Sequence, residues 1–236
     1  MKKTPKKILE SARDLFNTRG VSNVRLKDIA KNIDISPGNL SYHYGTKKDL
    51  ISAVLISLQQ TTKDMRADNM RSLESEDYLG VIKNYLRFQI SHRFFYRDIL
   101  DIANLVPEAK EAYEELMNQV ICFTKNGMYL AVGKGLLKAE PHDGSFHFFA
   151  KNVWAILNSW LIEREVLGKD KIGMDEIMLA IWEYHYPYLT EKGVVLYHNV
   201  KKKIPQLVRE EMLVVCLLYT SPSPRDRTRS RMPSSA

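Results

Sequence analysis

The sequence predicts an all-α protein, with a small N-terminal helix-turn-helix domain joined by a long helix to a C-terminal helical bundle. Three observations predict it. Apolar residues recur at spacings of three and four along most of the 236 residues. No stretch alternates apolar and polar residues for long enough to indicate a strand. Between Arg25 and Asp49, two short helical patterns flank a tight turn and a third begins at once.

The first two helices are delimited by ordinary local signals. Thr4 and Pro5 combine an N-cap hydroxyl with a proline at the first helical position, and Gly20 marks the end of that helix. A second apolar face runs from Leu26 to Ile33. These two segments are expected to pack on the helix that follows the turn.

The turn and the next two helix starts are marked as clearly. Asp34 tolerates the left-handed backbone that a tight turn needs. Ser36 and Pro37 restart the helix, and Thr46 with Asp49 forms a capping box for the following one. This order of helix, turn and helix is typical of a DNA-binding helix-turn-helix. An ordinary helical hairpin has the same start and stop signals.

The remaining patterns predict a bundle. A long helix starts at Thr46 and fades between Asn69 and Ser75. Further helices are expected at 77–88, 107–131, 145–167, 175–189 and 194–212. The sequence therefore divides into a helix-turn-helix domain at 1–46 and a helical ligand-binding and dimerisation domain at 47–212. Residues 217–236 change composition and are predicted to be non-native, resembling translated cloning sequence, or a disordered tail; a native basic tail that grips DNA is the alternative.

Composition and charge limit the possible functions. Of the net charge of +7, residues 1–50 supply eleven Lys and Arg against five Asp and Glu, whereas residues 51–215 have twenty against twenty-two. Residues 1–50, the head, are thus basic, and the body that follows is nearly neutral. This partition indicates a polyanionic partner for the head. Two cysteines allow no disulfide framework or zinc cluster, and no segment is apolar for long enough to span a membrane. We expect a cytoplasmic protein with no metal and no cofactor.

The second helix of such a motif enters the major groove with its first residues at the base edges. Asn39 suits adenine because its amide donates and accepts at one base edge, and Lys47 at a helix N-terminus suits a phosphate. Solvated surface positions are the alternative for His43 and Lys47. The predicted DNA-binding residues are Arg25, Lys27, Ser36, Pro37, Gly38, Asn39, Ser41, Tyr42, His43 and Lys47.

Residues 8–50 resemble the N-terminal domain of the TetR family of bacterial transcriptional regulators. Within that family, the sequence is most similar to the QacR-like members. The matching pieces are Ala12-x-x-Leu15-Phe16-x-x-x-Gly20, Asp28-Ile29-Ala30, Ser36-Pro37-Gly38-Asn39-Leu40, Tyr42-His43-Tyr44 and Lys47 before Leu50. The chain departs from the family at Asp34, where glycine is usual, and at Ser41, where an aromatic residue is usual. The resemblance implies a homodimer on a palindromic double-stranded DNA operator, formed through the helices around 145–167 and 175–189, and a small-molecule effector in the body.

An apolar or amphipathic effector fits the aromatic composition of the body. Each aromatic taken singly is as readily explained as core. The predicted effector-binding residues are Tyr85, Phe88, His92, Phe95, Tyr113, Phe123 and Trp154.

These observations favour a sequence-specific transcriptional regulator, a repressor released by its effector. A ligand-independent DNA-binding protein is the first alternative, but it would not need so large an apolar body. An all-α enzyme is the second, and the chain offers no acid, base or metal set at motif spacing. His142 and His147, five residues apart, are the nearest approach to a metal pair.

Overall fold

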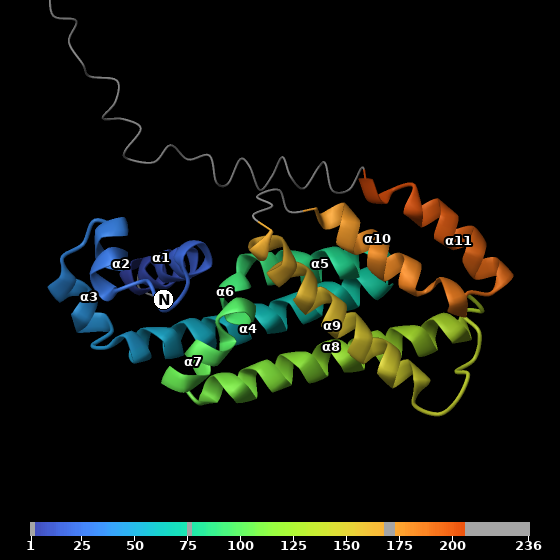
Figure 1. Cartoon of the computed structure of the whole chain (residues 1–236), viewed down its shortest axis with the longest axis horizontal. Coiled ribbons are helices and arrows are strands. Elements are labelled where there is room, and N and C mark those ends of the chain that lie inside the picture. Colours follow the sequence, from blue (N-terminus) through green and yellow to red (C-terminus); the bar gives the residue numbers. More distant parts are fainter. Residues whose placement is uncertain (1–2, 75–76, 168–172, 206–236) are drawn as a thin grey trace, which may run out of the picture.

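The computed structural model describes residues 3–74, 77–167 and 173–205, and within these ranges the regular secondary structure is helical (Figure 1). The head contains α1 (Lys3–Arg19), α2 (Leu26–Asn32) and α3 (Pro37–His43). The long helix α4 (Lys47–Glu74) leaves the head and runs along the body. The predicted fold class is confirmed.

The body is built from α4 and four further helices that pack with it. They are α5 (Tyr78–Ser91), α8 (Glu108–Gly133), α9 (Ser145–Val166) and α10 (Met174–Tyr184). Two short helices, α6 (Arg93–Arg97) and α7 (Ile99–Leu105), lie beside the head, and α11 (Glu191–Lys201) lies at the far end (Figure 1). α4 packs along α5, and α8 packs along α9. The protein is thus an elongated bundle with a small head at one end.

A continuous hydrophobic core runs from the head into the body. Phe16 of α1 is fully buried, and its ring centroid lies 5.7 Å from that of Phe94 in α6. Leu50, in the first turns of α4, is buried as well. The head is too small to bury a sufficient core alone, so this shared packing stabilises it.

Most of the predicted helix boundaries agree with the structure, and several differ. The helix expected over 77–88 continues to Ser91, and the one expected over 194–212 ends at Lys201. α1 already begins at Lys3, so Thr4 and Pro5 lie within its first turn. The helix expected over 175–189 ends at Tyr184 and continues as a 3-10 turn, Tyr186–Tyr188, because Pro187 has no N–H to donate to the helix. The last helix begins at Glu191, before the expected start at Val194.

The position of α11 depends on a close backbone contact. Thr190 caps the helix by accepting a hydrogen bond from the N–H of Gly193 at 3.1 Å, and its own N–H donates to Leu136 O at 3.1 Å. The Leu136 carbonyl leaves no room for a Cβ at position 193. Glycine there lets α11 lie against the end of α8. Expectations for residues 206–212 and 217–236 fall outside the described residues.

Candidate DNA-reading surface and internal cavity

The turn between α2 and α3 has the predicted geometry. Asp34 has a φ of 57°, the left-handed conformation that Asp adopts more easily than most residues. The N–H of Ile35 then donates to Ala30 O at 3.0 Å. Ser36 caps α3 by accepting from the N–H of Asn39 at 3.1 Å. Local side-chain chemistry therefore sets the angle between the two helices.

The outer face of α3 is exposed at most of the positions predicted to read bases. Gly38, Asn39 and Ser41 are exposed, and Tyr42 keeps 86% of its surface accessible. A Cβ at Gly38 would meet only Ser36 Oγ, at 4.0 Å, so no internal contact requires glycine there. Leu40 is fully buried and anchors the helix to the core. Base contacts by the exposed face stay a prediction.

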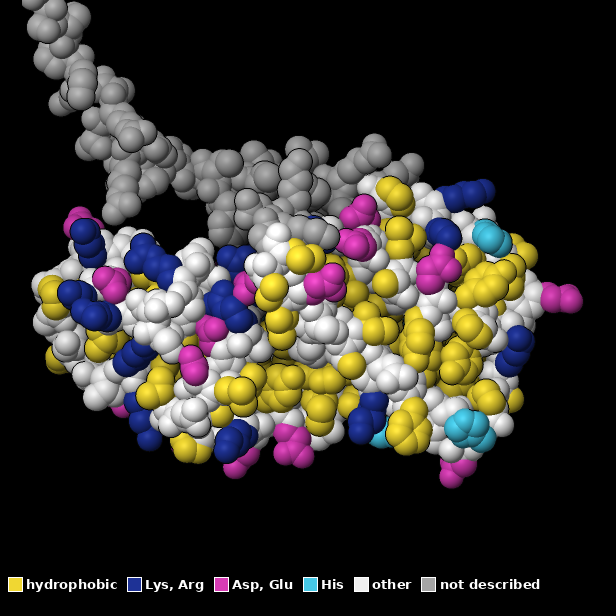
Figure 2. Space-filling view, viewed as in Figure 1, with side chains coloured by type: hydrophobic (Ala, Val, Ile, Leu, Met, Phe, Trp, Pro, Cys, Tyr) yellow, Lys and Arg dark blue, Asp and Glu magenta, His cyan; other side chains and the backbone are white. Residues whose placement is uncertain are grey.

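Three of the basic residues predicted to contact DNA lie at the starts of helices. Arg25 and Lys27 are exposed at the start of α2. At the start of α4, the N–H of Thr46 donates to Asp49 at 2.9 Å and the N–H of Asp49 donates to Thr46 at 3.1 Å, which confirms the capping box. Dark blue side chains are prominent on the head in Figure 2.

Lys47 is less exposed than its predicted role suggests. Its Nζ lies 3.5 Å from Ser22 O, in the loop after α1. Burial lowers the pKa of Lys47, and the nearby carboxylate of Asp101 in α7 opposes this shift. The Ser22 hydroxyl donates to the same carboxylate at 2.7 Å. Lys47 is therefore placed where the head meets the body, and its phosphate contact stays a prediction.

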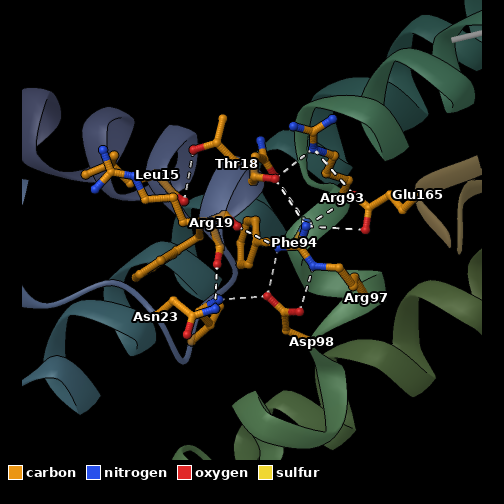
Figure 3. Close-up of polar contacts among 12 residues, drawn as sticks. Leu15, Thr18, Arg19, Asn23, Arg93, Phe94, Arg97, Asp98 and Glu165 are labelled. Atoms are coloured by element: carbon orange, nitrogen blue, oxygen red, sulfur yellow. Dashed lines mark hydrogen bonds and ion pairs between the residues drawn. The ribbon is translucent and has the colours of Figure 1, made fainter. Parts of the chain in front are cut away.

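A polar joint fastens the head to the body (Figure 3). The guanidinium of Arg97 donates to Phe16 O at 2.7 Å and to Asn17 O at 3.2 Å. Its Nε donates to Asp98 at 2.7 Å, and Asp98 accepts from the N–H of Val21 at 2.8 Å. Hydrogen bonding to Asp98 raises the pKa of Arg97. We refer to Asn17, Val21, Arg93, Arg97, Asp98 and Glu165 as the head–body joint.

Helix α9 also reaches this joint. Glu165 accepts from Arg97 Nη1 at 3.2 Å and lies 3.8 Å from Arg93 Nε. Asn17 donates to Ser91 O at 2.8 Å and accepts from the N–H of Phe94 at 3.1 Å. Arg93 also takes part, because its Nε donates to Asn17 O at 2.9 Å. Both arginines are structural, and no local signal revealed partners about eighty residues away.

The body contains two adjacent cavities. The larger has a volume of about 570 Å³ and lies between α4, α5 and α8. The smaller, about 150 Å³, lies between α5, α8, α10 and α11. Both are largely apolar, and they share Leu73, Val81, Phe123, Thr124 and Gly127 in their linings. The hollow region is of the size and character of a small-molecule site.

The seven predicted effector residues are only partly gathered there. Tyr85 lines the larger cavity, and Phe123 lines both. The other five line neither of them. Helical periodicity shows which side of a helix is apolar. It does not show whether that side faces a cavity or packs against another helix. An effector role for these five residues stays a prediction.

Those five residues pack elsewhere. Phe95, Tyr113 and Trp154 form an aromatic cluster, with Tyr113 5.9 Å from Phe95 and 5.5 Å from Trp154 between ring centroids. The rings of Phe88 and His92 lie 4.7 Å apart between centroids, tilted by 32°. His92 is buried, with Nδ1 3.0 Å from Phe88 O, and burial lowers its pKa to about 4.

Sequence reasoning missed the contribution of α4 to the cavity. Met65, Arg66, Asn69, Met70 and Leu73 all line it, at the spacing of one helical face. The apolar residues of this face were visible in the sequence as a helical pattern that weakens toward its end. The residues that face them across the cavity were not. Within the described residues no group of three His, Cys, Asp or Glu side chains is placed to hold a metal ion. The described helices include none long and apolar enough to cross a membrane.

These features define a class: an all-α protein with an exposed recognition helix and a hollow body. The comparisons identify the family. The family described as "Bacterial regulatory proteins, tetR family" matches residues 8–54, and the one described as "Bacterial transcriptional repressor" (TetR) matches residues 58–195. The chain belongs to the TetR family.

Individual relatives match the chain at low sequence identity. A Bacillus subtilis protein, "Probable HTH-type transcriptional regulator YttP", is 28% identical over 118 residues, which are 47% of this chain and 57% of that relative. The chain thus spans little more than half of that relative's length.

Solved structures agree in fold. A TetR-family regulator from Marinobacter aquaeolei has a TM-score of 0.73 at 23% identity, over 86% of this chain and 98% of that one. A protein from Saccharomonospora viridis, crystallised in complex with choline, has a TM-score of 0.64 at 17% identity, over 81% and 100%.

Proposed function

We propose that the protein is a homodimeric, sequence-specific DNA-binding repressor that acts in the cytoplasm and releases its operator when a small apolar or amphipathic effector binds. One observation carries the proposal. Helix α4 begins at Lys47, four residues after the end of α3, and further along it lines the larger cavity from Met65 to Leu73. A molecule that fills the cavity therefore contacts the helix that orients the head.

The DNA-reading roles follow from exposure and chemistry. Asn39 forms hydrogen bonds to a base edge from the N-terminal end of α3, and Gly38 lets the backbone approach the groove. Arg25, Lys27 and Lys47 contact phosphates and set the position of the helix on the duplex. The remaining predicted contacts are those of Ser36, Pro37, Ser41, Tyr42 and His43.

Dimerisation is proposed through α9 and α10. Phe148, Ala155 and Ile162 are exposed at seven-residue intervals on α9, and Phe148 keeps 62% of its surface accessible. Hydrophobic side chains are prominent over the region where Figure 1 draws α9 and α10 (Figure 2). An exposed apolar stripe of this kind is typical of a face that pairs with another subunit.

The coupling between effector and DNA is geometric. Two heads must lie about one helical turn apart, roughly 34 Å, to occupy successive major grooves. An effector that binds one tilt of α4 better than the other shifts the population toward that tilt. The structural neighbour crystallised with choline supports the idea that bodies of this fold accept small molecules.

The test is selection of bound DNA from a random-sequence pool by the purified full chain. We expect enrichment of two half-sites related by two-fold symmetry, with centres about one helical turn apart or a multiple of it. The preference should persist as salt rises, whereas a non-specific binder loses all sequences together. Recovery of no symmetric motif would contradict the proposal.

A further inference from the structure

The two cavities of the body meet at Gly127, inside α8. Gly127 lines both of them, and so do Phe123 and Thr124, one helical turn earlier. Ala131, one turn later, lines the smaller cavity, so this face of α8 is turned toward the hollow. Apart from the backbone of its own helix and its chain neighbours, no atom lies within 4 Å of a Cβ added to Gly127. A side chain at this position would therefore enter open space where the cavities join.

Neither packing nor backbone conformation requires glycine at position 127. The residue lies within α8, and its φ is not in the left-handed region. Glycine is a poor helix former, so almost any other residue would stabilise this helix better. Gly193 is different, because the Leu136 carbonyl leaves no room for a Cβ there. What glycine provides at 127 is an open passage between the two cavities.

The charged end of the hollow lies at Arg66 of α4. Among the described residues that line the two cavities, Arg66 is the only Lys, Arg, Asp or Glu. It is exposed and has no hydrogen bond or ion pair within the described part of the chain. An adjoining groove shares Arg66 and adds Lys63 and Glu115, whose carboxylate accepts from Gln119 at 3.0 Å. This end of the hollow therefore favours an anionic group over a cationic one.

The other end of the hollow is apolar. Leu73 follows Arg66 by two helical turns, about 10 Å along α4, and lines both cavities. In the smaller cavity, Trp182 Nε1 already donates to Tyr197 O at 3.2 Å, and His185 Nδ1 lies 2.7 Å from a carbonyl oxygen of α10. Helices α4 and α8 run in the same direction away from the head (Figure 1). The hollow thus extends from a charged end nearer the head to an apolar end farther from it.

We propose, resting on the proposed function, that the effector is an elongated apolar molecule that ends in an anionic group, such as an alkyl carboxylate. Its anionic group binds at Arg66. Its apolar chain passes Gly127 into the smaller cavity, and burial of that chain drives binding. Gly127 is then the residue that determines how long a chain the protein accepts. The ligand contacts α4, the helix that leads to the head, along its whole charged half.

Calorimetry on the purified full chain, without DNA, tests both parts of this assignment. The probes are octanoate, dodecanoate and octylammonium, each kept below the concentration at which it self-associates. Dodecanoate should bind at least about tenfold more tightly than octanoate, because its additional methylenes are buried beyond the junction. Octanoate should bind several-fold more tightly than octylammonium. Equal binding of the two carboxylates, tighter binding of octylammonium, or no binding of any probe would overturn the proposal.

Variants of α8 locate the junction. Gly127→Leu places a side chain in the open space, so the advantage of dodecanoate over octanoate should fall to about one while octanoate still binds. Gly133→Leu is the matched control: it lies on the same helix and its added Cβ also meets nothing within 4 Å, but it lines neither cavity. It should keep the tenfold advantage. Gly127→Ala fills less space and should give an intermediate ratio, which keeps the test decisive should the leucine variant fail to fold. An unchanged ratio in the Gly127 variants would contradict the assignment.

Variants of α4 locate the anionic group. Arg66→Gln should abolish the preference for octanoate over octylammonium and leave the chain-length ratio unchanged. Lys63→Gln removes an exposed positive charge that lines only the adjoining groove, and it should retain the preference. A charge preference that survives in Arg66→Gln would show that Arg66 does not bind the anion. No DNA is present in these measurements, so failure of the repressor proposal is distinguishable from failure of this one.

Discussion

At the scale of single residues, Asn39 and Lys47 illustrate two kinds of DNA contact. Asn39 is exposed on α3, where its amide has both a donor and an acceptor to offer a base. Lys47 is half-buried at the start of α4 and supplies only charge. Because bases differ in their edges and phosphates do not, the two residues are expected to affect binding in different ways.

Substitution of these two residues should separate specificity from affinity. Asn39→Ala should relax base preference at one position in each half-site and cost about 1–3 kcal/mol on the preferred sequence. Lys47→Ala should weaken all sequences alike and reduce the salt dependence by about one counterion per head. Binding of a selected operator and its single-base variants at several salt concentrations measures both effects. The Asn39 assignment fails if its variant keeps the original base preference.

At the scale of elements, His92 lies at the junction of α5 and α6. Burial lowers its pKa from 6.5 to about 4, so the folded protein keeps it neutral at pH values where the unfolded chain binds a proton. Stability should therefore be lost as pH falls from about 6.5 toward 4. The loss attributable to His92 is on the order of 3 kcal/mol.

Urea unfolding of the wild type and His92→Leu measures this contribution. The variant should lose less stability between pH 6.5 and 4, since it has no proton to take up at this position on unfolding. His185, whose pKa burial also lowers, is present in both proteins and affects both slopes equally. The difference between the two proteins at pH 8 reports packing and the lost hydrogen bonds of the imidazole, without titration, and serves as the control. Identical pH dependence would contradict the assignment.

The head–body joint is the second feature at this scale. Arg97 supplies charged hydrogen bonds to two carbonyl oxygens at the end of α1 and to Asp98, and its removal deletes them. Each acceptor then keeps only its other donor, from Gly20, Arg93 or Val21. Arg97→Met should therefore lower the free energy of unfolding by about 2–3 kcal/mol, measured by urea unfolding at pH 7. The control is Arg13→Met, which removes a surface arginine paired with its neighbour Asp14 and should cost less than about 1 kcal/mol. Equal effects would show that the joint adds little stability.

At the scale of the whole molecule, the proposed dimer depends on the exposed face of α9. Ile162→Glu places a charge on that face, where 44% of the isoleucine surface is accessible, and should convert the dimer to monomer. The monomer should also lose more than about tenfold in operator affinity, because one head cannot span two half-sites. Val195→Glu on α11 is the matched control: its side chain is 64% accessible but lies outside the proposed face. Sedimentation of the three proteins tests the prediction, which a dimeric Ile162→Glu would contradict.

The sequence did not predict which face of each helix lines the cavity. Tyr85 and Phe123 were predicted to contact an effector, and both line the hollow. Phe95 carries the same apolar signal but is fully buried in an aromatic cluster. Asn69, a polar residue near the fading end of a helix, gave no signal at all. Its place in the cavity lining depends on how α5 and α8 pack beside α4.

The sequence by itself determined what depends on residues within about four positions of each other. The left-handed Asp34, the caps at Ser36 and Thr46 and the buried Leu40 all follow from local chemistry and helical period. Tertiary structure alone decided the head–body joint and the cavity lining. These need groups such as Asn17 and Arg97, eighty residues apart, to meet. Their meeting depends on how whole helices pack, which no short-range pattern encodes.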